Sequence, residues 1–346
     1  MAKKVKWGVI GSGGIARRRT IPEGIVPAGN AELAIVYDID AKVNAEVADE
    51  FGVLAAGSIE ELLASDIDAV YIATPAGLHL TQTLACVVSG KNVLCEKPFG
   101  ITVEDAQKMI AACREAGVLL GTGFMMRFGA QHRAALKMIQ DGQLGALIYG
   151  RAQLSCWYPP AEDAWRQDPA TGGGGSLIDM GSHCIDILEM FFGRASTVSC
   201  FISNAVHRYG SEDGAVVLLS FEGGAMATVD TFFCIPDASG KNALELYGSK
   251  GSILAKGTIG QADSGRMTAY LNEGGLYDAQ QDGSESRGVA ILPLPENMYR
   301  AEIVEFSQAM IEGRQPSNNA ELGLRSQKVL AACYRSAETG RVVEVI

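Results

Sequence analysis

The sequence predicts an α/β domain with a doubly wound parallel sheet, followed by an α+β domain with an open, mostly antiparallel β-sheet. Three observations lead to this prediction. Short, wholly apolar runs alternate with amphipathic segments through residues 5–121. A glycine-rich turn separates the first apolar run from the first helical segment. Later, residues 197–255 hold runs of alternating or β-branched character that are joined by short turns.

The amino-terminal half shows the regular alternation of strand and helix. We expect strands at residues 5–10, 31–37, 69–73, 92–95 and 118–121. Helices are expected from Ile15 onward and at residues 41–51, 59–64, 79–89 and 103–116. Strands that are apolar throughout and separated by helices are typical of a parallel sheet covered on both faces.

The carboxy-terminal half does not continue the regular alternation of strands and helices. Helices are predicted at residues 131–140 and 177–192, then strands at 197–203, 215–221, 225–233, 243–247 and 252–255, then helices at about 299–312 and 319–339. A chain of 346 residues exceeds what one core usually holds, so we expect domains at 1–123 and 124–346. The last two helices, at about 299–339, are expected to pack back at the domain interface.

Composition and charge exclude some classes of partner. The formal net charge of -11 opposes binding to nucleic acid or to an anionic membrane surface, since both need basic patches. No apolar stretch reaches the roughly 18 residues that span a bilayer. A cytoplasmic location is expected from this and from an amino terminus that moves from a few lysines straight into a strand pattern. The eight cysteines are scattered singly without a Cys-x-x-Cys pair, which favours reduced core residues and no bound metal.

The glycine-rich turn matches a dinucleotide-binding fingerprint. Gly11-Ser12-Gly13-Gly14-Ile15-Ala16 fits G-x-G-x-x-G/A between a predicted strand and helix, the context that marks a Rossmann domain. The helix start would offer unpaired N–H donors to a pyrophosphate. Asp38 ends the second strand, where the cofactor's ribose hydroxyls are expected, and its charge favours NAD. Arg17, Arg18 and Arg19 leave NADP open, and the glycines could also merely turn the chain.

A second polar feature lies on an otherwise apolar helix. Asp179, His183 and Asp186 are spaced i, i+4, i+7 and therefore share one face of the helix predicted at 177–192. Such a stripe must find partners or face a cavity. An ordinary Asp–His helix pair is the alternative. The glycine run at 172–175, which would let a ligand or the other domain approach closely, favours the functional interpretation.

The chain resembles the Gfo/Idh/MocA oxidoreductases, which act mainly on sugars, inositols and sugar derivatives. The similarity extends over nearly the whole chain. Its most specific parts are Glu96-Lys97-Pro98 and Asp179-x-Gly181-x-His183. The other similar segments are Gly11 to Ala16, Ala73 to Pro75, Leu78-His79, Trp165-Arg166, Gly172 to Ser176, Asp186, Tyr247-Gly248 and Lys250-Gly251. The resemblance implies a catalytic set of Lys97, Asp179 and His183. His183 would exchange the hydroxyl proton, Lys97 would hold the substrate oxygen, and Asp179 would orient the substrate or His183.

The resemblance also implies roles for residues around this set. Thr74, Pro75 and His79 would line the cofactor cleft, and Glu96 would lie near the nicotinamide; His79 could equally cap a helix. Pro98 would follow a cis peptide bond. Substrate contacts are implied for Arg127, Trp165 and Arg166 and, more weakly, for Trp157, Tyr158 and Tyr299. His132 and His207 have no motif around them and are interpreted as structural or exposed.

These observations favour an NAD(P)-dependent dehydrogenase acting on a sugar, glycoside or inositol-like polyol. Two alternatives stay open: an NAD-dependent glycosidase that oxidises its substrate transiently, and a binding protein that senses NAD(H) or a sugar. The dehydrogenase requires the Lys97 ammonium and the His183 imidazole to converge on the nicotinamide. The resemblance further implies a homodimer or homotetramer built through the carboxy-terminal sheet.

Overall fold

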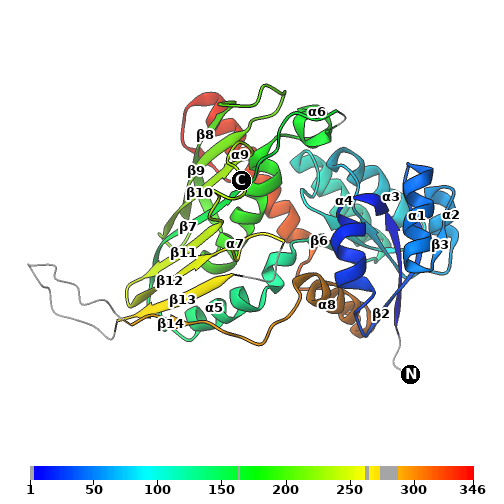
Figure 1. The fold of residues 1–346 in the computed structure, drawn as a ribbon, viewed down its shortest axis with the longest axis horizontal. Helices are drawn as coiled ribbons and strands as arrows, with labels where there is room; N and C mark the ends of the chain where they lie inside the picture. The colour runs from blue at the N-terminus through cyan, green and yellow to red at the C-terminus, as the bar shows by residue number, and fades with distance from the viewer. Residues whose placement is uncertain (1–3, 163, 262–264, 273–286) are drawn as a thin grey trace, which may run out of the picture. The chain divides into compact units, whose positions relative to one another are not determined.

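The computed structural model describes residues 4–162, 164–261, 265–272 and 287–346. The chain forms two compact units. The first unit comprises residues 1–128, 168–173 and 296–328, and the second comprises 129–167, 174–295 and 329–346. Each unit contains one sheet (Figure 1).

The sheet of the first unit has the order β3-β2-β1-β4-β5-β6 with every pair parallel. Its strands are β1 (Val5–Ile10), β2 (Ala31–Tyr37), β3 (Leu54–Ala55), β4 (Ala69–Ile72), β5 (Asn92–Glu96) and β6 (Leu120–Gly123). The chain runs outward from β1 through β2 to β3, then returns to β4 on the other side of β1. This reversal is the topological switch point of a Rossmann sheet, where ligands bind beyond the carboxyl ends of the strands.

The helical segments of this unit mostly follow the sequence prediction. They are η1 (Ser12–Ile25), α1 (Ala41–Phe51), α2 (Ile59–Ala64), η2 (Ala76–Leu78), α3 (His79–Val88), α4 (Val103–Ala116), η3 (Met125–Phe128), α6 (Pro169–Gly172), α8 (Met298–Glu312) and the start of α9 (Ala320–Thr339). Local caps fix several ends. Asp40 accepts the N–H groups of Lys42 and Val43 at the start of α1, and Gly52, with φ at 66°, ends it.

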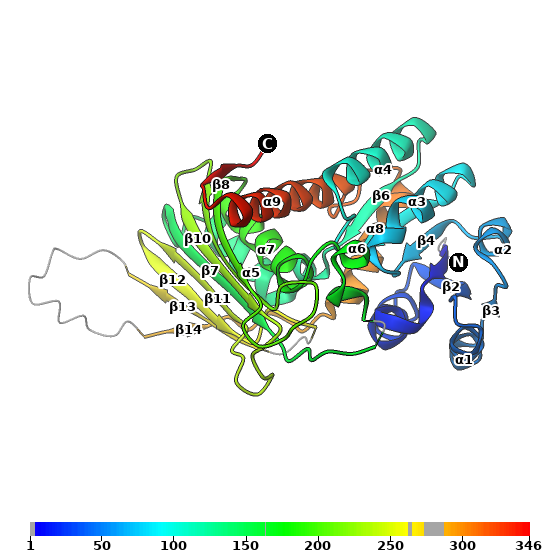
Figure 2. The same ribbon diagram turned by 90° about the horizontal axis from the view of Figure 1, so that it is seen from above.

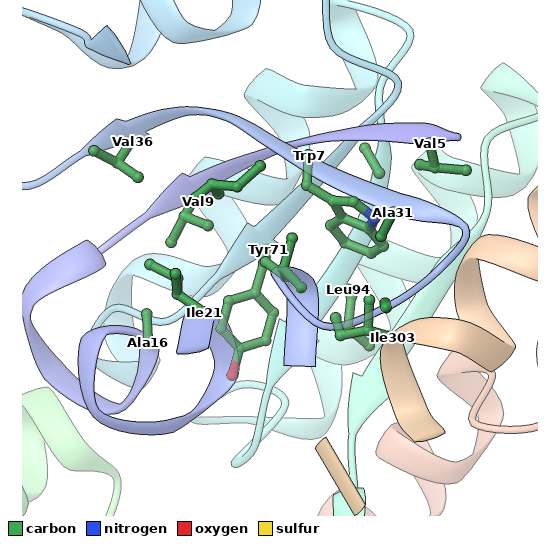
Figure 3. Packing of buried hydrophobic residues seen from close by; sticks show 14 of the residues in the cluster. Val5, Trp7, Val9, Ala16, Ile21, Ala31, Val36, Tyr71, Leu94 and Ile303 are labelled. Carbon is green, nitrogen blue, oxygen red and sulfur yellow. The ribbon is translucent and has the colours of Figure 1, made fainter. Parts of the chain in front are cut away.

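The core of the first unit joins segments that are far apart in the sequence (Figure 3). Trp7 of β1 and Tyr71 of β4 are fully buried beside Ile21 of η1 and Ile303 of α8. The Trp7 indole N–H donates to the Ser307 hydroxyl at 3.1 Å. Helix α8 therefore packs in the core of the first unit although it lies near the end of the chain.

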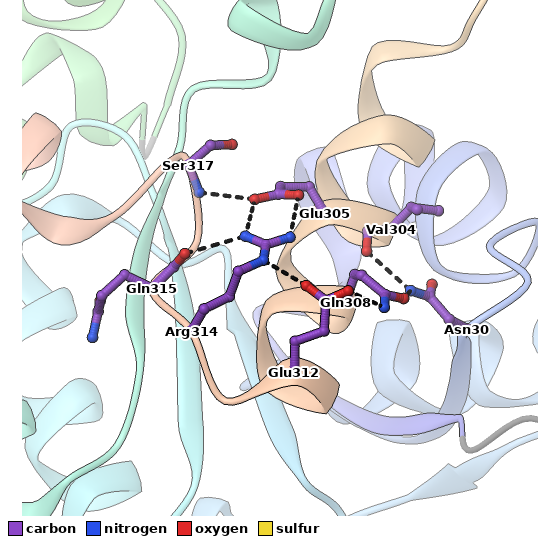
Figure 4. A network of polar contacts seen from close by, with 8 residues as sticks. All are labelled: Asn30, Val304, Glu305, Gln308, Glu312, Arg314, Gln315 and Ser317. Carbon is purple, nitrogen blue, oxygen red and sulfur yellow. Dashed lines mark hydrogen bonds and ion pairs between the residues drawn. The ribbon is translucent and has the colours of Figure 1, made fainter.

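A polar network lies along α8, from the middle of the helix to the residues just after its end (Figure 4). The guanidinium of Arg314 contacts both carboxylate oxygens of Glu305, at 2.7 and 2.9 Å, and its Nε contacts Glu312 at 2.6 Å. The pKa of Glu305 is lowered chiefly by its hydrogen bond from Arg314. Asn30 donates to the Val304 carbonyl at 3.0 Å, which ties the turn before β2 to α8.

The sheet of the second unit has the order β14-β13-β12-β11-β7-β10-β9-β8-β15. Its strands are β7 (Leu147–Ser155), β8 (Ala195–Ser203), β9 (Gly214–Phe221), β10 (Met226–Phe232), β11 (Ala243–Gly248), β12 (Gly251–Lys256), β13 (Arg266–Leu271), β14 (Val289–Ala290) and β15 (Val343–Glu344). Among the described strands of this second sheet, only β7 and β10 pair in parallel. The predicted fold class, a doubly wound parallel sheet followed by an open, mostly antiparallel one, is confirmed.

Several boundaries differ from the prediction. The central strand β7 was not predicted, because Gly150, Arg151 and Gln153 interrupt its apolar pattern. Strand β13 and the two-residue strands β3, β14 and β15 were also missed. The strand predicted at 118–121 lies at Leu120–Gly123, and β5 runs one residue further than predicted, to Glu96.

Helices cover one face of the second sheet (Figure 2). They are α5 (Ala130–Gln140), η5 (Leu177–Gly181), α7 (Ser182–Phe192) and the later part of α9. Gly150 lets β7 approach α7, since a Cβ there would lie 2.6 Å from Phe192. In the described chain no helix covers the other face, where Phe201, Leu218 and Met226 are exposed (Figure 2). None of the described helices combines the length and the apolar character needed to cross a bilayer.

The helix predicted at 177–192 is not one regular α-helix. Residues Leu177–Gly181 form a wider π-helical turn, and the α-helix begins at Ser182. Asp179 lies in the wide turn, whereas His183 and Asp186 lie in the α-helix. The spacing i, i+4, i+7 of Asp179, His183 and Asp186 therefore begins in a π turn and continues into the α-helix.

Candidate active site

The glycine turn after β1 has two glycines that the fold itself requires. Gly11 has φ at 82°, and a Cβ there would lie 2.9 Å from the Ala73 carbonyl. A Cβ on Gly13 would lie 2.4 Å from Val43 of α1. These close approaches bring the start of η1 against α1 and against the loop after β4.

The remaining positions of the turn offer groups to a ligand. A Cβ on Gly14 would meet no atom of the described chain within 4 Å, so this stretch of backbone borders open space. The Ser12 hydroxyl is buried and has no hydrogen-bond partner among the described residues. An open backbone at a helix start and a hydroxyl in need of a partner fit the pyrophosphate of a dinucleotide.

Asp38 lies directly beside this turn. Its Oδ2 accepts the Gly13 N–H at 2.8 Å, and its Oδ1 accepts the Asp40 N–H at 3.1 Å. Two backbone donors thus hold the carboxylate at the end of β2. This is the position that a Rossmann domain uses to contact the adenosine ribose.

Glu96 ends β5 inside a buried hydrogen-bond chain. The Tyr71 hydroxyl donates to Glu96 Oε1 and lies 2.9 Å from the Thr20 hydroxyl. Burial, followed by the charge of Glu96, raises the pKa of Tyr71 well above its usual value. Glu96 Oε2 also accepts the Lys97 N–H at 3.1 Å. The end of β5 is therefore fixed from the core outward, which the sequence did not reveal.

Lys97 follows β5 at the carboxyl edge of the sheet and is half-buried. The peptide bond between Lys97 and Pro98 is cis, as the resemblance implied. His79 connects this turn to the loop after β4: its Nδ1 lies 3.0 Å from the Pro98 carbonyl and its Nε2 lies 2.9 Å from the Thr74 carbonyl. Because His79 is buried and both ring nitrogens contact the backbone, it positions these two loops.

Trp165, Arg166, Asp179 and His183 belong to the second unit, whereas Arg127 lies in η3 of the first. Arg166 Nε pairs with Asp179 Oδ1 at 3.0 Å, and the guanidinium lies 4.2 Å from the centre of the Trp165 ring. Burial acts to lower the pKa of Arg166, but Asp179 and then Tyr158 together outweigh it, so the pKa of Arg166 is raised. His183 lies in the first turn of α7 and is 6% exposed.

The residues predicted as weaker or structural are distributed over both units. Tyr299 is buried in α8 of the first unit, and its hydroxyl has no hydrogen-bond partner among the described residues. Trp157 packs edge-on against His207 in the second unit, with ring centres 4.8 Å apart. His207 Nε2 also lies 3.1 Å from the Phe233 carbonyl, and His132 is buried in α5. Both histidines are therefore buried, not exposed.

Glu212 is a site residue that sequence reasoning missed. It is buried, and its Oε1 accepts the N–H groups of Gly175 and Leu177, each at 2.9 Å, and the Tyr334 hydroxyl at 3.0 Å. Burial raises the pKa of Glu212, although these donors oppose the rise. The carboxylate therefore caps the helical segment that carries Asp179 and leads to His183.

The glycine run before η5 serves this same cap. A Cβ on Gly174 would lie 1.9 Å from the Tyr334 hydroxyl, and a Cβ on Gly175 would lie 2.0 Å from the Glu212 carbonyl oxygen. The close neighbours of these two glycines thus come from their own unit. We expected the glycine run to let a ligand or the other domain approach, but at Gly174 and Gly175 the close neighbours are residues of the same unit. A polar triplet, Ser211-Glu212-Asp213, directly before a strand was the signal available in the sequence.

Comparison with known proteins gives matches along most of the chain. A family described as an oxidoreductase family with an NAD-binding Rossmann fold matches residues 5–124, and the GFO/IDH/MocA C-terminal domain matches residues 132–254. The chain is 34% identical over 345 residues to 1,5-anhydro-D-fructose reductase of Ensifer adhaerens, covering 98% of each sequence. It is 29% identical to D-xylose 1-dehydrogenase (NADP(+)) 2 of Haloferax volcanii, covering 98% of this chain and 99% of the relative.

Solved structures show the same fold. Aldose-aldose oxidoreductase from Caulobacter crescentus, complexed with glycerol, matches with a TM-score of 0.88 and 26% identity over 99% of this chain and 100% of its own. Levoglucosan dehydrogenase in complex with NADH and levoglucosan matches with a TM-score of 0.86, at 22% identity, over 99% of this chain and 100% of its own.

Proposed function

The chain belongs to the Gfo/Idh/MocA oxidoreductase family, and from this premise we propose that it oxidises a hydroxyl carbon, or reduces the corresponding keto carbon, of a sugar, glycoside or inositol-like polyol. It is an NAD(P)-dependent oxidoreductase. The observation that carries the substrate proposal is the place of Lys97, directly after β5 at the carboxyl edge of the first sheet. The relatives named for anhydrofructose and xylose support the carbohydrate class.

The residues of this chain have distinct roles in the proposed reaction. The backbone around Gly13 and Gly14, with the Ser12 hydroxyl, would hold the dinucleotide, whose nicotinamide supplies the hydride acceptor or donor. His183 Nε2 or Nδ1 takes the hydroxyl proton during oxidation and returns it during reduction. The Lys97 ammonium holds the substrate oxygen and stabilises the negative charge that develops on it.

Asp179 is proposed to orient the substrate. Its pair with Arg166, at 3.0 Å, fixes the carboxylate in one place. A carboxylate oxygen held in this way accepts a hydrogen bond from one sugar hydroxyl, and the Arg166 guanidinium can donate to a second. Trp165, beside Arg166, offers an apolar face of the kind that packs on sugar rings.

A substrate panel tests this function. We expect at least one free sugar, glycoside or inositol to reduce added NAD⁺ or NADP⁺, followed at the nicotinamide absorbance band. Product release from glycosides without accumulation of reduced cofactor would instead identify the glycosidase alternative. Tight binding of the dinucleotide with no turnover across the panel would leave the sensor alternative and contradict the dehydrogenase.

We also propose a homodimer or homotetramer assembled on the open face of the second sheet, in the cytoplasm. Phe201, Val216, Leu218 and Met226 are exposed on neighbouring strands β8, β9 and β10, and together they form an apolar patch on this face. Contiguous apolar patches on a surface mark interfaces. The cytoplasmic location is supported by the eight cysteines, none of which forms a disulfide.

Leu218→Asp should break this assembly. A carboxylate placed in the middle of the apolar patch would be buried without a partner in the oligomer, so we expect the sedimenting species to shift to the monomer. Val88→Asp is the control, since Val88 is an exposed apolar residue on α3 of the first unit. A wild-type protein that sediments as a monomer at all concentrations would contradict the proposal.

A further inference from the structure

We propose that Tyr71 of β4 is a positioning residue for Lys97. It holds the Lys97 backbone through Glu96, and through Thr20 it ties that backbone to η1, the helical segment that begins at the glycine turn. This role rests on the proposed function, because Lys97 is assigned there to the substrate oxygen. All four residues belong to the first unit, so the hydrogen-bond chain lies within one compact body.

The hydrogen bonds around Tyr71 run in one direction. A phenol carries a single hydroxyl proton, and Tyr71 donates it to Glu96 Oε1. The Thr20 hydroxyl, whose oxygen lies 2.9 Å from the Tyr71 oxygen, must therefore be the donor in that contact. Burial, followed by the charge of Glu96, raises the pKa of Tyr71, so the phenol keeps its proton at neutral pH. Glu96 therefore receives a hydrogen bond from the core at neutral pH.

The other carboxylate oxygen of Glu96 fixes the residue that follows it. Glu96 Oε2 accepts the Lys97 N–H at 3.1 Å, so the side chain of one residue holds the backbone of the next. On the neighbouring strand β6, a Cβ at Gly123 would lie 3.2 Å from Glu96 Cδ, so the backbone of β6 packs closely on the carboxylate. Rotation of this carboxylate would break its hydrogen bonds to both Tyr71 and Lys97, and these bonds therefore hold each other in place.

Tyr71 can anchor this turn because its ring is fully buried. It lies in the same apolar cluster as Ile21 of η1 and Ile303 of α8 (Figure 3). Dense packing of this kind holds a side chain in one rotamer. The Lys97 backbone is therefore held from the core of the first unit, and η1 is held from the same point through Thr20.

The proposed hydride transfer depends on such a fixed geometry. The start of η1 would hold the pyrophosphate, and Lys97 would hold the substrate oxygen. The hydrogen-bond chain through Tyr71 connects these two supports and so fixes the distance between cofactor and substrate. A misplacement of about 1 Å between reacting groups costs about 100-fold in rate. Loss of the Tyr71 hydroxyl should therefore slow the chemical step while both ligands still bind.

Tyr71→Phe tests this role in the full chain, because it removes the hydroxyl and keeps the ring. We expect kcat to fall about 10- to 100-fold on whichever substrate the panel identifies, with the substrate KM and the NADH dissociation constant within about threefold of the wild type. Hydrogen exchange at the Lys97 amide, resolved by fragmentation in a mass spectrometer, should become about tenfold faster. Ser307→Ala is the matched control and should leave all of these quantities unchanged, since it removes a buried hydroxyl that is bonded to Trp7 at 3.1 Å in the same core.

A pair of substitutions at Thr20 separates positioning from stability. Thr20→Val keeps the shape of the side chain but removes the hydroxyl, whereas Thr20→Ser keeps the hydroxyl but removes a methyl group. Both therefore disturb the packing of a fully buried residue. We expect kcat to fall about threefold to tenfold in the valine variant and to stay within about twofold of the wild type in the serine variant. These two variants also keep the role testable if Tyr71→Phe does not fold.

Three results would overturn the proposal. The first is wild-type kcat in Tyr71→Phe when the wild-type enzyme turns over a substrate. The second is an equal loss of kcat in Tyr71→Phe and Ser307→Ala, or in the two Thr20 variants, because such a loss would reflect core stability alone. The third is unchanged exchange at the Lys97 amide in Tyr71→Phe.

Amide exchange also separates this role from the proposed function. If the wild-type chain turns over no sugar, glycoside or inositol, the proposed substrate class fails on its own. Faster exchange at the Lys97 amide in Tyr71→Phe, but not in Ser307→Ala, would then still support the hold of Tyr71 on the Lys97 backbone. Equal exchange in the two variants would overturn it.

Discussion

Lys97→Met and His183→Asn should each lower kcat by about 10²- to 10⁴-fold and leave NADH affinity within a few-fold of the wild type. Lys97 carries the only positive charge in the segment Glu96–Phe99 at the strand end, and methionine keeps its apolar stem while removing the charge. Asparagine at position 183 keeps a polar group but cannot take up a proton. The loss should therefore appear in the chemical step, because neither substitution alters the glycine turn.

The measurement is kcat and KM on whichever substrate the panel identifies, together with calorimetric titration of NADH. Lys108→Met, an exposed lysine on α4, is the matched control for removing a lysine charge. Wild-type kcat in either the Lys97 or the His183 variant would remove that residue from the catalytic set. Parallel loss of NADH binding would instead assign it to the cofactor site.

Gly175→Ala should strongly destabilise the second unit. The new Cβ would lie 2.0 Å from the Glu212 carbonyl oxygen and 3.0 Å from two further Glu212 backbone atoms. Backbone cannot rotate away as a side chain can, so the strand end or the start of η5 must shift. We expect a loss of about 3 kcal/mol in the free energy of unfolding.

Thermal or urea unfolding of the full chain gives this difference. Gly223→Ala is the control in the same unit, since a Cβ there meets no described atom within 4 Å. The control should change stability by roughly 0.5 kcal/mol or less. Equal free energies of unfolding for the two variants would show that the close contact between Gly175 and Glu212 does not limit the stability of the second unit.

The sequence predicted the helices of the first unit closely because their signals are local. Helix α1 matches its predicted bounds, and its ends are fixed by a capping aspartate and a glycine that lie next to it in the chain. Strand β7 was missed for the opposite reason. Its polar residues face the open side of the sheet, and what makes it a strand is pairing with β10 and β11.

In the candidate site, too, local motifs were predictable from the sequence and contacts between distant residues were not. The glycine turn, Asp38 and Lys97 were predictable because short motifs place them at strand ends. The pairing of Arg166 with Asp179, the capping role of Glu212 and the burial of His79 between two carbonyls were not. Each depends on residues brought together by the fold across a turn or a loop, and no spacing in the chain encodes that approach.

The position of β7 also determines when the second sheet can form during protein synthesis. This strand is complete at Ser155, but its neighbours β10 and β11 begin only at Met226 and Ala243. Until the ribosome has reached Phe232, β7 has neither partner, and its backbone hydrogen-bonding groups must stay with water or be shielded by a chaperone. The chain therefore bears the entropic cost of closing a long loop before the centre of this sheet can nucleate.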